Sequence, residues 1–168
     1  MKIDVRMTRK LLLQIRQDLA RPHPFAFERV GFLACKVAET KPRGVIVFPY
    51  HYLEVEDEDY LNDVGVGAMM GPAAIRKALQ FAYNNNVAMF HAHIHDHYGP
   101  PWFSDIDLRE TNNFVPDFWH VRPTFPHGAL VLSRDSISGL CWMPGRKKPF
   151  RILGFNIVGF PMTFIREQ

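Results

Sequence analysis

The spacing of apolar residues along this chain switches between the period of a strand and the period of a helix. Residues 2–7 alternate apolar and polar side chains, which predicts a half-buried strand. Thr8 is typical of a helix N-cap, and apolar residues then recur at helical spacing as far as Pro22. Residues 27–37 and 44–48 are apolar runs on either side of a Lys-Pro-Arg-Gly turn, which predicts a hairpin.

The second half of the chain continues with elements that do not alternate regularly. We expect a helix over residues 72–83, a strand over 87–95, a short helix after Ser104, a hairpin around 134–136 and a strand over 150–157. A parallel α/β fold would instead repeat one strand and one helix. The sequence therefore predicts an α+β fold, an αβα sandwich with a mixed β-sheet.

Length and composition set the class of the protein. A chain of 168 residues is long enough to bury a real hydrophobic core, and we take residues 1–168 as a single domain. The hydrophobic fraction of 47%, which includes 14 Phe, is that of a globular protein rather than of a disordered chain.

No segment is typical of export or of a membrane span. The apolar run Leu11–Leu13 is too short for the core of a signal peptide. The longest apolar stretch, residues 152–165, contains Asn156 and falls short of the roughly 20 residues of a spanning helix, so we expect a buried strand there. Cys35 and Cys141 lie in apolar surroundings, and we expect both to be reduced. We therefore expect a cytoplasmic protein without a membrane partner.

The charges are distributed unevenly around a net charge of +3. Acidic residues crowd one segment, which with the glycines up to Gly71 predicts an exposed loop; they are Glu54, Glu56, Asp57, Glu58, Asp59 and Asp63. The basic cluster Arg146–Lys148 is short and has no recognition motif beside it. Weak basicity of this kind does not indicate a nucleic-acid partner.

Histidine occupies every second position at the end of the predicted strand over residues 87–95. Side chains at positions i and i+2 of a strand leave the same face, so two members of the ladder His91, His93, His95 and His97 can hold one metal ion. Zinc accepts imidazole nitrogens at roughly 2.0–2.1 Å. A histidine-rich strand end with no catalytic metal would show the same ladder.

A carboxylate follows the ladder after a stiff turn. The loop Tyr98–Phe103 is rich in Pro and Gly, and Ser104 can cap a helix that carries Asp107. Two histidines and one carboxylate would leave the fourth position of a zinc ion open, which is the pattern of catalytic zinc sites. The sequence therefore predicts a catalytic zinc site.

These residues resemble the signature of the JAMM zinc metalloproteases, also called the JAB or MPN+ family. The signature is a Glu on an early strand, then His-x-His-Pro, and then Ser-x-x-Asp. The segment that begins Glu28-Arg-Val-Gly-Phe-Leu is similar to the Glu-x-x-Gly-x-Leu strand of the family, and Ser104-Asp-Ile-Asp107 matches Ser-x-x-Asp. The resemblance spans residues 8 to about 140.

Two departures from the signature leave the histidine pair open. No Pro follows the second histidine, and no pair gives the seven-residue gap of the family. His93 and His95 leave eight residues before Ser104, whereas His91 and His93 leave ten. The pair His93 and His95 is favoured because it needs a single inserted residue, and His91 remains the alternative ligand.

The resemblance implies a fold like that of JAMM proteases and cytidine deaminases, and the activity of a zinc-dependent peptidase or isopeptidase. The substrate would be the C-terminal tail or the isopeptide bond of a ubiquitin-like protein. The ligands of Zn²⁺ would be His93, His95 and Asp107, with Glu28 as general base and Ser104 supporting the oxyanion.

Other interpretations of the same residues stay open. Glu28 could be a strand carboxylate paired with Arg29 or Lys36, and Ser104 could be a helix cap alone. The chain could also be a zinc hydrolase of a small amide or of a sulfur-carrier protein, or a non-catalytic scaffold subunit. The remaining histidines have no partner pattern, and we expect surface or loop positions for them; they are His23, His51, His120 and His127.

Overall fold

A mixed sheet forms the centre of the computed structural model, which describes residues 1–24, 26–62 and 67–166. Within these residues nine strands follow the order β11-β10-β1-β3-β2-β6-β7-β8-β9, and β4 and β5 form a separate pair. The strands are β1 (Lys2–Thr8), β2 (Val30–Thr40), β3 (Gly44–Glu54), β4 (Tyr60–Leu61), β5 (Met69–Met70), β6 (Ala88–Ile94), β7 (His127–Leu132), β8 (Ile137–Trp142), β9 (Phe150–Arg151), β10 (Gly154–Val158) and β11 (Thr163–Arg166). The helices are α1 (Arg9–Leu19), α2 (Pro72–Asn85), α3 (Asp105–Phe114) and α4 (Phe118–Val121), with 3-10 turns η1 (Asp57–Asp59) and η2 (Val115–Asp117). The predicted α+β class with a mixed sheet is confirmed.

Strand β6 lies in the interior of this sheet. It pairs with β2 in the antiparallel sense and with β7 in the parallel sense. The predicted hairpins are present, because β2 pairs with β3 and β7 pairs with β8, both antiparallel. Strand β1 is parallel to both of its neighbours, β3 and β10. The chain that carries the histidine ladder is therefore fixed by strands on both sides.

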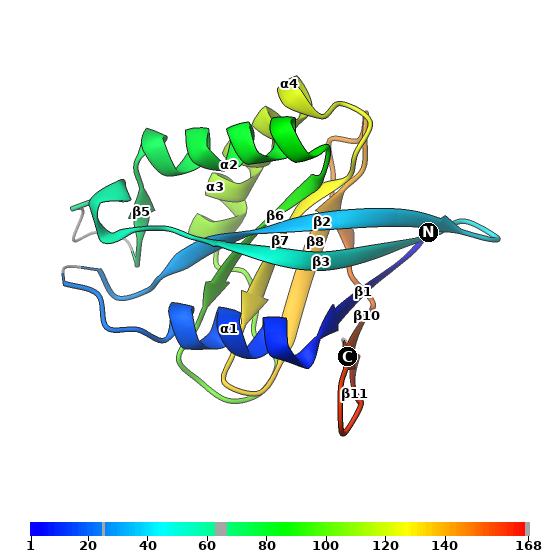
Figure 1. Cartoon of the computed structure of the whole chain (residues 1–168), viewed down its shortest axis with the longest axis horizontal. Coiled ribbons are helices and arrows are strands. Elements are labelled where there is room, and N and C mark those ends of the chain that lie inside the picture. The colour runs from blue at the N-terminus through cyan, green and yellow to red at the C-terminus, as the bar shows by residue number, and fades with distance from the viewer. Residues whose placement is uncertain (25, 63–66, 167–168) are drawn as a thin grey trace.

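Helices cover both faces of the sheet, with α1 on one side and α2 to α4 on the other (Figure 1). Side chains of β2 alternate between the two cores. Leu33 packs with the apolar face of α1, and Phe32 packs in the other core, which includes Ala74, Ala78 and Ala82 of α2. Small side chains on α2 allow its backbone to lie close to the sheet.

Most of the acidic segment is exposed, as expected, but it is not a loop throughout, because it contains η1 and leads into β4. Asp59 is 7% exposed and its carboxylate lies 2.5 Å from Nζ of Lys77 on α2. Asp57 lies 2.7 Å from the buried guanidinium of Arg29, and Tyr60 is buried. Cationic side chains therefore pair with two carboxylates of this segment, Asp57 and Asp59. Asp63, which was part of the same expectation, lies outside the described residues.

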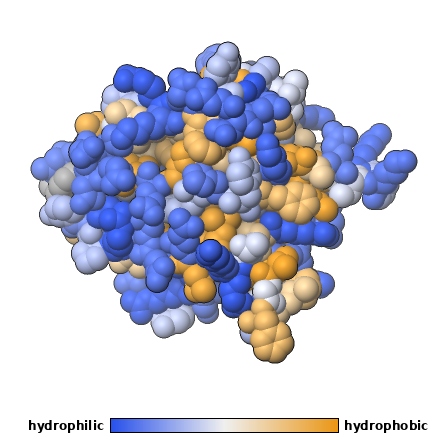
Figure 2. All heavy atoms as spheres, in the orientation of Figure 1, coloured by the Kyte–Doolittle hydropathy of each residue, from blue (hydrophilic) through white to orange (hydrophobic). Residues whose placement is uncertain are grey.

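The C-terminal apolar stretch is not the continuously buried strand that its hydropathy predicts. It forms β10 and most of β11 instead, and Phe160 between the two strands is 99% exposed. Figure 2 shows apolar side chains projecting where the β10–β11 hairpin lies in Figure 1. Strand β11 pairs only with β10, so Phe164 has few neighbours and is 63% exposed.

Two further expectations concern the membrane and the cysteines. Among the helices of the described residues, none has the length and apolarity that crossing a membrane requires. Cys35 and Cys141 are both buried free thiols.

Candidate metal centre

The register of β6 determines where the histidines point. His91 and His93 lie opposite Phe32 and Val30 of β2, respectively. Both belong to the face that α2 and α3 cover, and both are buried, with His93 only 2% exposed. His95 follows the strand, and its backbone N–H donates to Leu132 O at 2.9 Å, which continues the alignment with β7. The ladder therefore reaches the end of the sheet beneath α3.

Helix α3 delivers Asp107 to the same place through a capping box. The hydroxyl oxygen of Ser104 accepts a bond from the backbone N–H of Asp107 at 3.1 Å, and Ser104 N–H donates to Asp107 Oδ2 at 2.7 Å. The predicted N-cap is thus present. Reciprocal capping fixes the carboxylate at the first turn of the helix.

Three of the predicted ligands come together. Single ligand atoms of His93, His95 and Asp107 all lie within 4.8 Å of one another. Asp107 Oδ2 is 3.4 Å from His93 Nε2 and 3.6 Å from His95 Nε2. Bonds of roughly 2.0–2.1 Å in a tetrahedron place two ligand atoms roughly 3.3–3.4 Å apart. The spacing of these atoms could therefore hold a metal ion with little rearrangement.

The hydrogen bonding of His93 supports the same conclusion. Both of its ring nitrogens are buried, and neither has a hydrogen-bond partner within the described part of the chain. Buried polar groups almost always have partners. Two imidazole nitrogens and a carboxylate oxygen form a donor set that fits zinc. His91, the alternative ligand, does not belong to the group of three.

The electrostatics of the cluster favour an ionised carboxylate. Burial alone would raise the pKa of Asp107, but His93, His95 and the Ser104 N–H hold it below its usual value. Bonding to Asp107 and the nearby charge of Glu28 raise the pKa of His95 against the effect of burial. Burial lowers the pKa of His91 to about 3.

Glu28 reaches the cluster from outside the sheet, and the expectation that it lies on a strand is wrong. It lies before β2, outside any helix or strand, and its backbone N–H donates to Gly67 O at 3.0 Å. Its Oε1 lies 3.9 Å from His95 Nε2. Burial raises the pKa of Glu28, while His93 and His95 oppose that shift.

Glu28 does not form the ion pair with Arg29 or Lys36 that was the alternative to a catalytic role, because both side chains bind elsewhere. Arg29 is directed to the opposite side, where it donates to Pro22 O at 2.8 Å and pairs with Asp57. Lys36 lies near backbone carbonyls at the end of α2. Glu28 is therefore directed at the histidines while both predicted partners are bound elsewhere.

Two positioning residues were not found from the sequence. Tyr60 Oη accepts from Val30 N–H at 2.9 Å and so holds the start of β2 beside Glu28. A Cβ on Gly67 would lie 2.9 Å from Glu28 Oε2, so the missing side chain leaves room for the carboxylate. An aromatic residue within an acidic run was the available signal for Tyr60.

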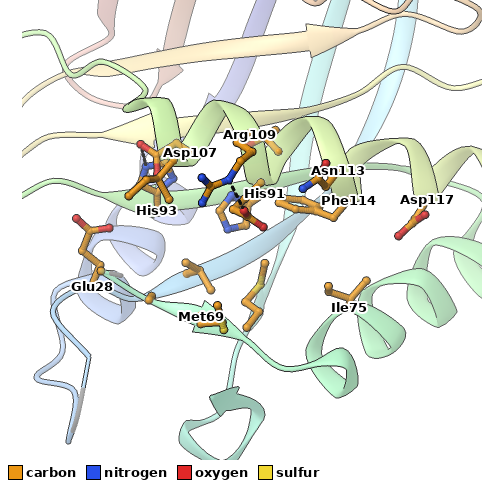
Figure 3. Close-up of a pocket in the computed structure, with 17 residues that line it drawn as sticks. Glu28, Met69, Ile75, His91, His93, Asp107, Arg109, Asn113, Phe114 and Asp117 are labelled. Carbon is orange, nitrogen blue, oxygen red and sulfur yellow. Dashed lines mark hydrogen bonds and ion pairs between the residues drawn. The ribbon is translucent and has the colours of Figure 1, made fainter. Parts of the chain in front are cut away.

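A cavity of about 330 Å³ opens beside the cluster. Glu28, His93 and Asp107 line one end of it, and His91 lies further along the same wall (Figure 3). The opposite wall comes from Met69 of β5 and Ile75 of α2, as Figure 3 shows. A metal ion in the cluster would therefore face a pocket that can receive a ligand.

The expected surface positions of the remaining histidines are confirmed for some of them and wrong for others. His97 stacks on Trp102 with ring centroids 5.1 Å apart, and Trp102 is 64% exposed. His120 is exposed, as expected. For His127 a surface position is wrong, because it is 0% exposed and its Nδ1 accepts from Met89 N–H at 3.1 Å. Partners distant in sequence determine its burial.

Comparison with known proteins adds no assignment to this geometry. No protein-family model matches the chain, and no curated protein matches it either.

Proposed function

We propose that this chain is a zinc-dependent peptidase or isopeptidase of the JAMM type, which acts on the C-terminal tail or isopeptide bond of a ubiquitin-like protein. The observation that carries the proposal is the approach of Glu28 to the group His93, His95 and Asp107. A site that only stored a metal ion would not need a second, partly buried carboxylate directed at its ligands. The resemblance of the residue pattern supports the substrate class, and helices on both sheet faces agree with the sandwich of that family.

Each residue has a distinct part in this proposal. When bound, zinc supplies a Lewis acid for the carbonyl and a water whose pKa falls toward roughly 7. Glu28 accepts the proton of the attacking water and passes it to the leaving amine. Its raised pKa suits this role, because a pKa closer to neutral pH makes the carboxylate a stronger base in the first step. Asp107 keeps its charge and remains available as a ligand.

Ser104 serves the helix and the reaction together. Its hydroxyl oxygen accepts from Asp107 N–H, and a hydroxyl that accepts one bond still has its own hydrogen to donate. That hydrogen would support the oxyanion of the tetrahedral intermediate, a contribution of roughly 3–4 kcal/mol when the donor is preorganised.

Metal content is the first test. We expect about one zinc per chain in the purified protein by inductively coupled plasma mass spectrometry, and loss of that zinc in His93→Ala and Asp107→Ala. His120→Ala is the matched control, since its ring is exposed and lies outside the group of three. Circular dichroism of each variant separates loss of the site from loss of the fold.

Hydrolysis is the second test. Glu28→Gln should keep its zinc and lose the cleavage of ubiquitin-like proteins fused at their C-terminus to an amide-linked fluorophore. A loss of roughly 100-fold or more fits removal of a general base. Wild-type protein that stays metal-free in excess zinc would refute the hydrolase proposal and favour the scaffold. Zinc-loaded protein that cuts small amides but no ubiquitin-like fusion would refute only the substrate class.

A further inference from the structure

The cavity beside the metal cluster has the size of a pocket for one side chain. Its volume of about 330 Å³ is at the lower end of the roughly 300–1,000 Å³ of small-molecule sites. Most of its inner wall is apolar and comes from four elements: Val30 of β2, Met69 and Met70 of β5, Ile75 of α2 and Phe114 of α3. Such a wall suits an apolar body of limited size.

The cavity lining also contains polar side chains, among them Thr111, Asn113 and His91, and His91 is the one considered for a ligand because its ring nitrogens have no partner among the described residues. His91 is 7% exposed, and neither of its ring nitrogens has a hydrogen-bond partner in the described ranges. Aromatic edges hold the ring, with centroid distances of 5.7 Å to Phe32 and 5.1 Å to Phe114. Figure 3 shows His91 on the cavity wall, and it lies two residues before His93 on β6. A buried polar group without a partner is destabilising, and a ligand group that bonds to it could offset that cost.

The acidic groups of the cavity lie at its solvent side and are paired. Glu110 is 54% exposed and its Oε1 accepts from Arg109 Nε at 3.0 Å. Asp117 is 48% exposed and lies 3.8 Å from the ring of His120. Glu28 and Asp107 belong to the metal cluster. The inner end therefore offers an imidazole rather than a free negative charge, which favours a neutral ligand tip over an ammonium group.

We propose that this cavity binds a phenol-type side chain, with the aromatic ring against the apolar wall and the hydroxyl group bonded to His91. A hydroxyl both donates and accepts, so it can pair with either tautomer of the ring. In a substrate this side chain would be a tyrosine close to the bond that is cut, and this part rests on the proposed function. His91 would then determine specificity, and it is not a metal ligand.

Binding of small probes tests the pocket without any hydrolysis assay. We would titrate the full chain with p-cresol and with toluene, before and after zinc loading, and follow backbone amide shifts by NMR. We expect p-cresol to bind about 10-fold more tightly than toluene, with shifts at Val30, Met70 and Phe114. His91→Phe keeps a ring between its aromatic neighbours and should remove the preference, whereas the control His97→Phe should retain it.

Each outcome decides the question. Equal binding of both probes to the wild type would overturn the proposal even if His91→Phe failed to fold. Tighter binding of n-butylammonium would overturn it in favour of a cationic ligand. A preference for p-cresol that survives in His91→Phe would show that His91 does not bind the hydroxyl group and would also overturn it. Selective binding together with no hydrolysis of ubiquitin-like fusions would keep the pocket and refute the proposed function. Hydrolysis of these fusions without selective binding would keep the proposed function and refute the pocket.

Discussion

His127 should make the fold sensitive to mild acid. Its ring is 0% exposed, with Nδ1 accepting from Met89 N–H and Nε2 bonded to Arg122 O, both at 3.1 Å. This arrangement requires the neutral ring, and burial lowers the pKa of His127 to about 4. In the unfolded chain the pKa is about 6.5. Between these two values the unfolded state binds a proton that the folded state does not, so stability falls as the pH falls.

The size of this effect follows from the two pKa values. Relative to neutral pH, protonation of His127 in the unfolded state should lower the free energy of unfolding by about 2 kcal/mol at pH 5 and about 3 kcal/mol at pH 4. A whole domain is stable by only about 5–15 kcal/mol, so the loss should be readily measured. The effect should saturate below the folded pKa, where both states carry the proton.

The assay compares urea unfolding of the wild type and His127→Gln from pH 7.5 to pH 4. The glutamine amide can still accept from Met89 N–H and donate to Arg122 O, but it does not titrate in this range. Other titrating groups act equally in both proteins and cancel in the difference. Parallel stability curves for the two proteins would refute the reasoning, because they would show that His127 titrates alike in both states.

Three glycine and serine positions give further predictions. Gly31→Ala would place a Cβ 2.2 Å from the hydroxyl of the buried Tyr52, so urea unfolding should show a loss of about 2–4 kcal/mol, and a loss below about 1 kcal/mol would contradict the packing. Ser104→Ala removes the cap of α3 and should cost about 1 kcal/mol of stability and roughly 10-fold in zinc affinity by competition titration, whereas unchanged affinity would show that the cap does not position Asp107. Gly67→Ala should displace the Glu28 carboxylate, so that zinc content by mass spectrometry stays the same while hydrolysis falls; full activity would show that the carboxylate has room to move.

The parts of the fold that depend on neighbours in sequence could be predicted. Thr8 and Ser104 cap α1 and α3 because an N-cap bonds to a backbone N–H only two or three residues away. The turn residues before Gly44 predict the β2–β3 hairpin for the same reason. The ligand group is also local, since alternation along β6 and one helix cap suffice to bring its members together.

The parts that depend on distant partners could not be predicted. His127 can be buried because Met89 N–H donates to its Nδ1 and Arg122 O bonds to its Nε2, and no pattern around residue 127 shows this. Glu28 reaches the site from a segment before β2 that Arg29 and Tyr60 hold through bonds to other elements. The exposure of β11 likewise follows from its place at the edge of the sheet, which only the complete strand order reveals.

The spacing of the ligands along the chain has a consequence for the order of assembly. The three candidate ligands lie within residues 93–107, whereas Glu28 is far away in sequence and comes close to them when β2 pairs with β6. Closing a short loop costs little entropy, so the ligands could gather around a metal ion before the sheet is complete. Metal binding to the unfolded chain would then reduce the stability that the ion gives to the native state. A metal ion could then bind to the proposed ligands before the proposed general base, Glu28, reaches them.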